Sequence, residues 1–320
     1  MPLCIHSPRA ARQSQFDDCT SSSIMGFHED KKATEGSNLP GRRVVVITAA
    51  GFPIDLLWLL PVGVVLAVLV RMLWEPHHPE TTHTRLGEGE HALRVLLLTD
   101  LHAGLNQVSI ADLLRAVANS GADVLLFAGD ACSGRHDASK AVRILSSLGT
   151  AATDAGMPAF AVPGNHDLPI DDRSYQSAGV PLLRNRNAVV RSRDGTRWNI
   201  AGLDDLRYGT PRFPACQAVA DIPAERTVVL SHNPDAVYLV PTGSARYLLS
   251  GHFHGGQIWM PFHIEFHVLR HERLVAEGVY RGRFERNGVI GYISRGIGCV
   301  VLPFRLGSRP EIAVLDLYAP

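Results

Sequence analysis

The sequence predicts an α/β fold that is preceded by one membrane-spanning segment. Three observations lead to this expectation: short apolar runs alternate with amphipathic helical stretches, further strand-like runs dominate the second half, and an uncharged run occurs near the N-terminus. Strands that alternate with helices indicate a parallel sheet with helices packed on it. With 320 residues, the chain has room for one large domain or two small ones.

Residues 1–43 are polar, rich in serine and mixed in charge, and they show no apolar period. A segment of this composition cannot bury enough apolar surface to fold, so we expect a disordered tail. Residues 44–74 predict a transmembrane or anchor segment, because residues 56–70 carry no charge. A helix over residues 52–70 spans roughly 28 Å, close to the hydrocarbon thickness of a bilayer at about 30 Å.

The flanks of the apolar run predict its orientation. Arg42 and Arg43 precede it, so by the positive-inside rule the N-terminal end stays in the cytoplasm and the main domain is extracytoplasmic. Arg71 on the far side weakens this asymmetry and keeps the cytoplasmic face open as an alternative. A buried helix of a soluble fold, a cleaved signal peptide and a twin-arginine export signal are the other interpretations.

Residues 75–92 are rich in Pro, Thr, Gly and His and are expected to form a linker. Its four histidines are expected to be solvated rather than to bind metal; they are His77, His78, His83 and His91. The main domain is expected over residues 93–320. The charge balance, with 31 basic and 31 acidic residues, favours no nucleic-acid partner, and five cysteines without a CxxC pair do not indicate a disulfide framework.

Apolar periodicity predicts the elements of this domain. Strands are expected at residues 93–99, 123–128, 158–162, 198–202, 227–231, 247–250, 289–294 and 312–317. The first helix carries apolar residues at helical spacing over 110–118, with Ser109 and Asp112 as an N-terminal capping box. A second helix is expected to begin near Ala138 and to stop at Gly149.

Five short motifs occur where predicted strands end. They are Asp100-Leu101-His102, Gly129-Asp130, Gly164-Asn165-His166-Asp167, His232 and Gly251-His252-Phe253-His254. The carboxyl ends of strands in an open α/β sheet converge on one crevice, so these side chains are expected to meet there. Carboxylate, amide and imidazole ligands together favour Mn, Fe, Zn or Co over Mg or Ca. Asp-x-His and His-x-His each place two ligands on one side of an extended segment, and the glycines of these motifs are expected to allow sharp turns.

This order of motifs resembles the calcineurin-like metallophosphoesterases over about residues 93–317. The flanking sequences at 99–104, 251–257 and 294–312 are similar to the bacterial membrane-associated branch, the YaeI/YkuE type. The resemblance implies a calcineurin-like β-sandwich of two mixed sheets flanked by helices, with an N-terminal transmembrane helix. An anchor or export segment is typical of that branch, which supports the interpretation of residues 44–74.

The resemblance also implies a site with two divalent transition-metal ions bridged by Asp130. The other ligands of the first metal would be Asp100, His102 and His254. The other ligands of the second would be Asn165, His232 and His252. His166 would face the substrate without touching a metal, and Asp167 would orient it. Such a metal pair activates a hydroxide that attacks phosphorus, and a histidine near neutral pH can protonate the leaving oxygen.

Some residues depart from the family pattern or invite a second interpretation. Phe253 replaces a small polar residue between two histidines and is expected to affect packing only, and Cys132 is interpreted as packing rather than a nucleophile. Residues 261–273 fit the pattern poorly, and they are expected to line the substrate cleft. The alternative is a third metal site at the helically spaced histidines His263, His267 and His271. Arg295 and Arg305 are interpreted as solvated, with contact to a second phosphate or a sugar as the alternative.

The expected function is hydrolysis of a phosphodiester or pyrophosphate linkage. The membrane segment favours a lipid-linked or envelope substrate, with relatives that cleave UDP-diacylglucosamine as a precedent by analogy. The alternatives are a phosphomonoesterase or phosphoprotein phosphatase, a soluble cyclic-nucleotide phosphodiesterase, and a non-enzymatic membrane scaffold.

Overall fold

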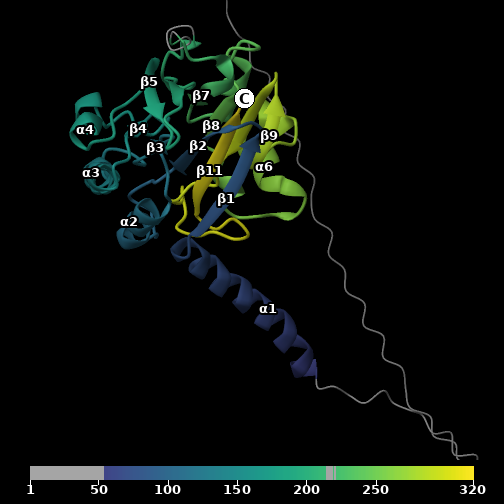
Figure 1. Cartoon of the computed structure of the whole chain (residues 1–320). Coiled ribbons are helices and arrows are strands. Elements are labelled where there is room, and N and C mark those ends of the chain that lie inside the picture. The colour runs from purple at the N-terminus through teal and green to yellow at the C-terminus, as the bar shows by residue number, and fades with distance from the viewer. Residues whose placement is uncertain (1–53, 214–218, 220) are drawn as a thin grey trace, which may run out of the picture. The chain divides into compact units, whose positions relative to one another are not determined.

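Two mixed β-sheets form the centre of the chain (Figure 1). The computed structural model describes residues 54–213, 219 and 221–320. The expected tail at 1–43 and the first part of the expected anchor segment lie outside these residues. The predicted α/β class, with two mixed sheets flanked by helices, is confirmed.

The first sheet has five strands in the order β1-β11-β2-β3-β4. Their bounds are β1 (Glu80–Gly87), β11 (Glu311–Ala319), β2 (His91–Leu98), β3 (Val124–Phe127) and β4 (Ala159–Ala161). Strands β2, β3 and β4 run parallel, as their alternation with helices predicted, and β11 runs antiparallel to β2. The carboxyl ends of β2, β3 and β4 therefore lie at one edge of the sheet.

The second sheet has six strands in the order β5-β6-β7-β8-β10-β9. Their bounds are β5 (Arg186–Arg191), β6 (Arg197–Gly202), β7 (Thr227–Leu230), β8 (Tyr247–Ser250), β10 (Val289–Ile293) and β9 (Gly282–Arg286). The inner strands β6, β7, β8 and β10 are parallel. All eight strands expected from the sequence are present, and β1, β5 and β9 were not predicted.

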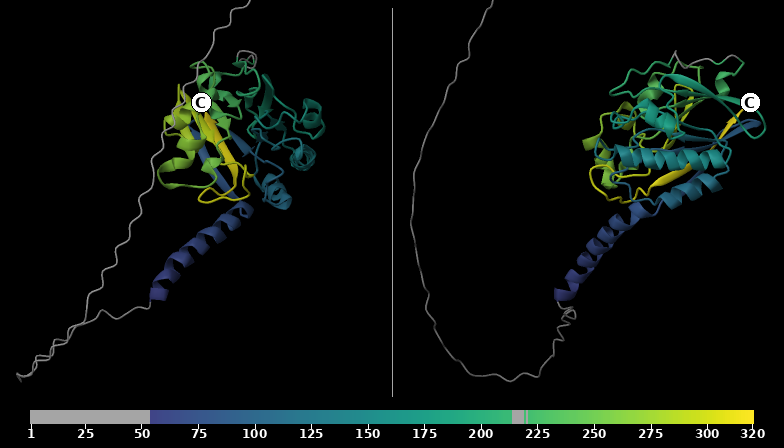
Figure 2. Two further views of the ribbon diagram at one scale, coloured as in Figure 1. Left: turned by 180° about the vertical axis from the view of Figure 1, so that it is seen from behind. Right: turned by 90° about the vertical axis from the view of Figure 1, so that its left-hand side faces the viewer.

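Helices cover the outer faces of both sheets (Figure 2). Within the described residues, the α-helices after the first strand whose bounds are defined are α2 (Ile110–Asn119), α3 (Ala138–Asp154), α4 (Asp172–Ser177), α6 (Ile264–Leu269) and α7 (Arg273–Ala276). The 3-10 helices are η1 (Glu75–His77), η2 (Ala224–Arg226), η3 (Pro234–Tyr238), η4 (His254–Gly256) and η5 (Pro261–His263).

Three apolar clusters hold these layers together. One lies between the first sheet and helices α2 and α3, a second between the two sheets, and a third under η3, α6 and α7 on the far face of the second sheet. Ser109 is confirmed as the N-cap of α2, because its side chain accepts from the Asp112 amide at 3.1 Å, and its hydroxyl donates to the Asp112 carboxylate at 2.7 Å. The expected stop at Gly149 is wrong: α3 continues to Asp154. A Cβ at Gly149 would lie 2.0 Å from the Ala178 carbonyl oxygen, so close packing requires this glycine.

Helix α1 (Ile54–Trp74) precedes the sheets. Residues 59–77 have a mean hydropathy of 1.7 and are only 11% buried, so this stretch is long and apolar enough to cross a membrane. The helix ends against the domain, where the Met72 carbonyl accepts from the Arg305 amide at 3.2 Å. The carboxylate of Glu75, which follows directly, is fully buried and pairs with Arg71 at 2.6 Å.

The structure corrects the expectation that residues 75–92 form a linker. It contains η1 and strand β1, and β1 pairs in parallel with β11 along its whole length. Edge strand β1 has a polar sequence in which Thr81, His83 and Arg85 are exposed, so no apolar alternation marked it as a strand. The folded domain therefore includes residues that the sequence assigned to a connection.

Candidate metal centre

The five motifs meet at the carboxyl ends of β2, β3, β4, β7 and β8, as expected from their positions in the sequence. The backbone there is strained. Five of the expected ligands have positive φ angles between 39° and 74°: Asp100, His102, Asp130, His252 and His254. Left-handed backbone is uncommon for residues other than glycine and gathers at functional sites. The expectation that Asp-x-His and His-x-His lie on extended segments is therefore wrong, both for Asp100 and His102 and for His252 and His254.

The glycines of the motifs are needed mainly because other parts of the chain approach them closely. Gly129 has a φ of 84°, which agrees with the expected sharp turn. A Cβ on Gly164 would lie 2.2 Å from Asp130 Oδ1, and one on Gly251 would lie 2.3 Å from Asp100 Oδ2. These two glycines let the backbone of one motif pack against the carboxylate of another.

The first group of converging donors consists of Asp100, His102 and His254, all buried. His254 Nε2 lies 3.3 Å from Asp100 Oδ1 and 3.2 Å from His102 Nε2. The Asp100 carboxylate also accepts from the backbone amide of His252 at 3.0 Å. Three ligand atoms of the types that transition metals favour thus face one point.

The second group consists of Asp130, His232 and His252. His232 Nε2 lies 3.0 Å from His252 Nδ1 and 3.2 Å from Asp130 Oδ2. Asn165 joins this group, because its Oδ1 lies 3.2 Å from His232 Nε2. Asp130 Oδ2 is also 3.5 Å from His102 Nε2 of the first group, so its carboxylate lies between the two groups.

Hydrogen bonds place one proton on the outward-facing ring nitrogen of each histidine in the second group. His232 Nδ1 lies 2.8 Å from the Ala128 carbonyl oxygen, which can only accept, so Nδ1 carries a proton, and Nε2 presents a lone pair when His232 is neutral. His252 Nε2 similarly donates to Glu272 Oε1 at 2.8 Å, which leaves the Nδ1 lone pair facing His232. Converging lone pairs and carboxylate oxygens require a positive charge between them, and this donor set fits a divalent metal.

The pKa values reflect the same requirement. Burial alone would lower the pKa of His232, but the Asp130 carboxylate raises it to about 10. Burial alone would raise the pKa of Asp130, but the neighbouring His232 and His102 lower it by more, so the net shift is downward. Burial lowers the pKa of His102 and that of His252 to about 4 each. The site therefore favours a cation beside Asp130 and neutral imidazoles elsewhere, which is the protonation that metal ligands need.

Asp167 has partners other than the expected one. Its carboxylate accepts hydrogen bonds from four backbone amides, those of Asp130, Ala131, Cys132 and Gly164, at 2.8–3.3 Å. The His166 ring instead directs Nδ1 to the Ser133 carbonyl oxygen at 3.3 Å, and the His166 amide donates to Asp130 Oδ1 at 2.8 Å. Asp167 thus holds the loops that carry Asp130 and Asn165, and its effect on His166 passes through the backbone.

A cleft of about 610 Å³ opens over both groups. His102, Asp130, Asn165, His166, His252 and His254 reach it from the ligand side. Residues from 256–270 and 300–302 also line it, so the poorly matching segment at 261–273 contributes to the cleft lining, as expected. Arg207 and Arg270 bring positive charge to the cleft lining.

Sequence reasoning missed Glu272 and Arg270. Arg270 Nη2 donates to the His252 carbonyl oxygen at 2.7 Å, and Nη1 lies 3.6 Å from Glu272 Oε1. Second partners of this kind orient a ligand histidine and set its tautomer. No spacing rule connects Glu272 to His252, because only the packing of the loop after α6 brings them together.

The third histidine group does not form. Helix α6 begins after His263 and ends at Leu269, so His271 lies beyond the helix. His263 packs on Tyr280, with 4.7 Å between ring centroids. Within the described residues, the two groups above are the clusters of His, Cys, Asp and Glu that could hold a metal.

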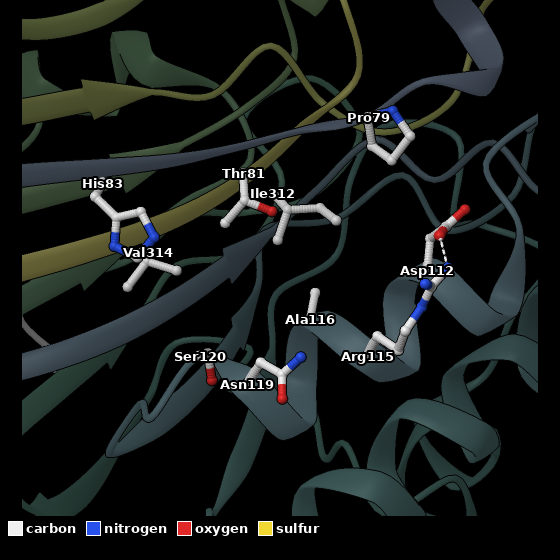
Figure 3. Close-up of a pocket in the computed structure, with 10 residues that line it drawn as sticks. All are labelled: Pro79, Thr81, His83, Asp112, Arg115, Ala116, Asn119, Ser120, Ile312 and Val314. Carbon is white, nitrogen blue, oxygen red and sulfur yellow. Dashed lines mark hydrogen bonds and ion pairs between the residues drawn. The ribbon is translucent and has the colours of Figure 1, made fainter.

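A separate pocket of about 380 Å³ lies between α2 and strands β1 and β11 (Figure 3). Its acidic residue, Asp112, is paired with Arg115, and its histidine, His83, stands on the exposed face of β1. Two of the other linker histidines have local partners: His78 Nδ1 lies 2.7 Å from the Trp74 carbonyl oxygen, and His91 Nδ1 lies 3.0 Å from Thr196 Oγ1.

Both closing arginines are structural, so their interpretation as solvated is wrong. Arg305 is fully buried and donates to the carbonyl oxygens of Arg295, Gly296, Gly298 and Ser308. Arg295 pairs with Glu80 of β1 at 2.9 Å.

The packing role of Cys132 agrees with its full burial and with a pKa that burial raises to about 12. Phe253 packs on Phe266, and its edge also reaches the cleft.

Comparison with known proteins agrees with this site. The family model for calcineurin-like phosphoesterases matches residues 93–256. YkoQ of Bacillus subtilis, an uncharacterized metallophosphoesterase, is 30% identical over 227 residues, which cover 69% of this chain and 82% of YkoQ. The phosphodiesterase YaeI of Escherichia coli is 29% identical over 234 residues, 70% of this chain and 82% of YaeI.

More distant similarity reaches LpxG of Chlamydia muridarum, named as a UDP-2,3-diacylglucosamine pyrophosphatase. It is 24% identical over 294 residues, which cover 72% of this chain and 85% of LpxG. The matching family model, the relatives and the converging metal-ligand residues together show that this chain belongs to the calcineurin-like phosphoesterases, enzymes that hydrolyse phosphoester bonds.

Proposed function

We propose that this enzyme hydrolyses a phosphodiester or pyrophosphate linkage with a pair of divalent transition-metal ions. The observation that carries the proposal is the position of the Asp130 carboxylate, 3.5 Å from His102 in one donor group and 3.2 Å from His232 in the other. Asp100, His102 and His254 would complete the ligands of one ion; Asn165, His232 and His252 would complete those of the other. When bound, such a pair supplies Lewis acidity and a hydroxide nucleophile at neutral pH.

His166 is proposed to act on the substrate rather than on a metal. Its Nδ1 donates to the Ser133 carbonyl oxygen, so Nε2 is the atom that can hold or deliver a proton in the cleft. It would stabilise charge that develops on the phosphoryl oxygens or protonate the leaving oxygen. Arg207 and Arg270 lie in the same cleft and would bind further oxygens of an anionic substrate.

We further propose that the enzyme is a single-pass membrane protein with an extracytoplasmic catalytic domain. The apolar and exposed α1 supports the anchor, and Arg42 and Arg43 before it support the orientation. The name of the relative LpxG supports a lipid-linked phosphate ester as the substrate class. Full-length protein should resist extraction from membranes by alkaline carbonate, and release into the wash would refute the anchor.

Two variants separate catalysis from metal binding. Asp130→Asn should lose metal and activity together, because two cations without the bridging charge repel each other at short range. His166→Ala should keep its metals and lower kcat by roughly 10²–10⁴, the range for a positioned acid–base group. A loss that shrinks for nitrophenyl diesters would identify leaving-group protonation as the main role.

The measurement is metal content beside kcat on bis(p-nitrophenyl) phosphate. Wild-type hydrolysis that persists in excess chelator, with the absence of metal verified, would overturn the proposed chemistry. Loss of metal in His166→Ala would overturn the residue assignment. A phosphomonoester or cyclic nucleotide hydrolysed faster than every diester and pyrophosphate tested would replace the proposed substrate class.

A further inference from the structure

Exposed apolar side chains gather on two segments beside the metal cleft. Within the described residues outside α1, eight large apolar side chains that are exposed form this group; we call them the apolar rim: Trp259, Met260, Phe262, Ile264, Val268, Leu269, Val301 and Leu302. Of the remaining exposed large apolar residues, Leu168 and Tyr208 line a second pocket beside His166, and the other three lie singly on separate elements. A contiguous patch of this kind on a folded domain marks a binding surface for a protein or a membrane.

Hydrogen bonds hold the two segments together as one surface. The Trp259 amide donates to the Leu306 carbonyl oxygen at 2.7 Å. The buried side-chain amide of Gln257 accepts from the Val300 amide at 2.7 Å and donates to the carbonyl oxygens of Val300 and Leu302 at 3.0 Å each. The rim is therefore a built feature of the domain rather than two independent loop tips.

The backbone is strained where the rim is most exposed. Phe262 is 88% exposed with a φ of 59°, and Val301 is 83% exposed with a φ of 65°. Left-handed backbone is unfavourable for an aromatic residue and especially for a β-branched one. Neither side chain gains burial within the described part of the chain. Strain that presents an apolar side chain to solvent indicates that the side chain contacts something outside this chain.

The rim is continuous with the metal cleft. Met260, Leu269, Val301 and Leu302 belong to both, and Ile258 and Val300 extend the apolar wall inward. The same cleft is lined by the donor groups and His166. An amphiphile with its apolar chain along this wall would place a phosphate ester at the metal centre.

The rim is also continuous with the end of α1. The loop that carries Val301 continues into Arg305, whose amide donates to the Met72 carbonyl oxygen at 3.2 Å. Arg309 stacks over the Trp74 ring, 5.5 Å from its centroid, and the Ser308 amide donates to the Glu75 carboxylate at 3.3 Å. In Figure 1 this loop is drawn in yellow and adjoins the C-terminal end of α1.

We propose that the apolar rim inserts into the surface of the bilayer that α1 spans, and that the cleft receives an amphiphilic phosphate ester laterally from that bilayer. This inference rests on the proposed function and specifies its substrate class as a lipid with its phosphate near the membrane surface. The partner is a bilayer rather than a protein because the rim adjoins the end of an apolar, exposed helix. Tryptophan and other apolar residues around a polar cleft are also typical of membrane interfaces.

The first test uses Trp259 as a native probe. The full chain is reconstituted in phosphatidylcholine nanodiscs whose acyl chains are brominated near the headgroup. The signal of Trp259 is the difference between wild type and Trp259→Phe, which removes the contribution of the other three tryptophans. We expect this difference signal to be quenched by the brominated lipid. An unquenched Trp259 in a well-incorporated protein would overturn the proposal, including the case in which the rim is an interface between two copies of the chain.

The second test measures substrate access with Phe262→Asn and Val268→Gln combined. Asn tolerates left-handed backbone and Gln suits a helix, so the fold should persist. Neither residue lines the cleft, so hydrolysis of bis(p-nitrophenyl) phosphate should stay at the wild-type level. Hydrolysis of a phosphate ester lipid in the nanodisc should fall at least about tenfold, since burial of two such side chains is worth that much in an equilibrium constant.

The matched control replaces exposed apolar residues elsewhere, Val189→Ser and Leu239→Ser, and should change neither rate. An unchanged rate on the lipid in the rim variant would refute the docking surface and leave the proposed chemistry standing. Absence of hydrolysis of the soluble diester by the metal-loaded wild-type protein would instead refute the proposed function.

Discussion

Glu272 should control how tightly His252 holds its metal. The carboxylate accepts from His252 Nε2 at 2.8 Å, and its side chain is only 16% exposed. This hydrogen bond helps to lower the pKa of Glu272 to about 2, against the opposing effect of burial. Glu272 therefore stays ionised at neutral pH and keeps the Nδ1 lone pair of His252 directed at the second donor group.

The expected loss follows from these contacts. Loss of the hydrogen-bond partner of a metal-binding histidine typically lowers metal affinity about 10–100-fold, or about 1.4–2.7 kcal/mol. Arg270 Nη1 lies 3.2 Å from His252 Nε2, and both carry protons, so the Glu272 carboxylate beside them offsets the repulsion between two facing donors. Glu272→Ala removes that acceptor and should reach the upper end of the range. Glu272→Gln keeps an acceptor oxygen and should lose less than about tenfold.

Competition with a chromophoric chelator measures the affinity, and kcat at saturating metal measures the chemistry. We expect a lower affinity with kcat largely restored by excess metal. Glu277→Ala is the matched control, because that exposed carboxylate pairs with Arg273 and Arg286 away from the ligands. Wild-type affinity in Glu272→Ala, or an equal loss in the control, would refute the reasoning.

Two further predictions concern pH and stability. The Asp130 carboxylate raises the pKa of His232 to about 10, so a metal that binds His232 below that pH must displace a proton. Apparent metal affinity should therefore rise roughly tenfold per pH unit between pH 6 and 9. A flat profile in chelator competition would contradict this. Arg305→Met removes the donor to four carbonyl oxygens and should cost about 3 kcal/mol or more, which lowers Tm by about 6–12 °C. An unchanged melting curve by circular dichroism would show that other donors or water replace it.

The sequence alone predicted the fold class and the set of converging residues, because both depend on local patterns. Apolar runs of strand length marked eight strands, and metal-ligand residue types at their ends indicated where chemistry could occur. The parallel direction of β2, β3 and β4 then brings Asp100, Asp130 and Asn165 to one edge of the sheet. Local patterns of this kind survive in any packing that keeps the strands parallel.

Only the tertiary structure decided the features that depend on contacts between remote segments. Strand β1 has no apolar alternation and exists through its pairing with β11, which lies more than two hundred residues later. Glu272 meets His252, Gly164 meets Asp130 and Arg305 meets four carbonyl oxygens because of how loops pack, which no local period encodes. Burial of an arginine and the fit of a glycine depend on the surfaces that surround them, and those surfaces form only when the chain has folded.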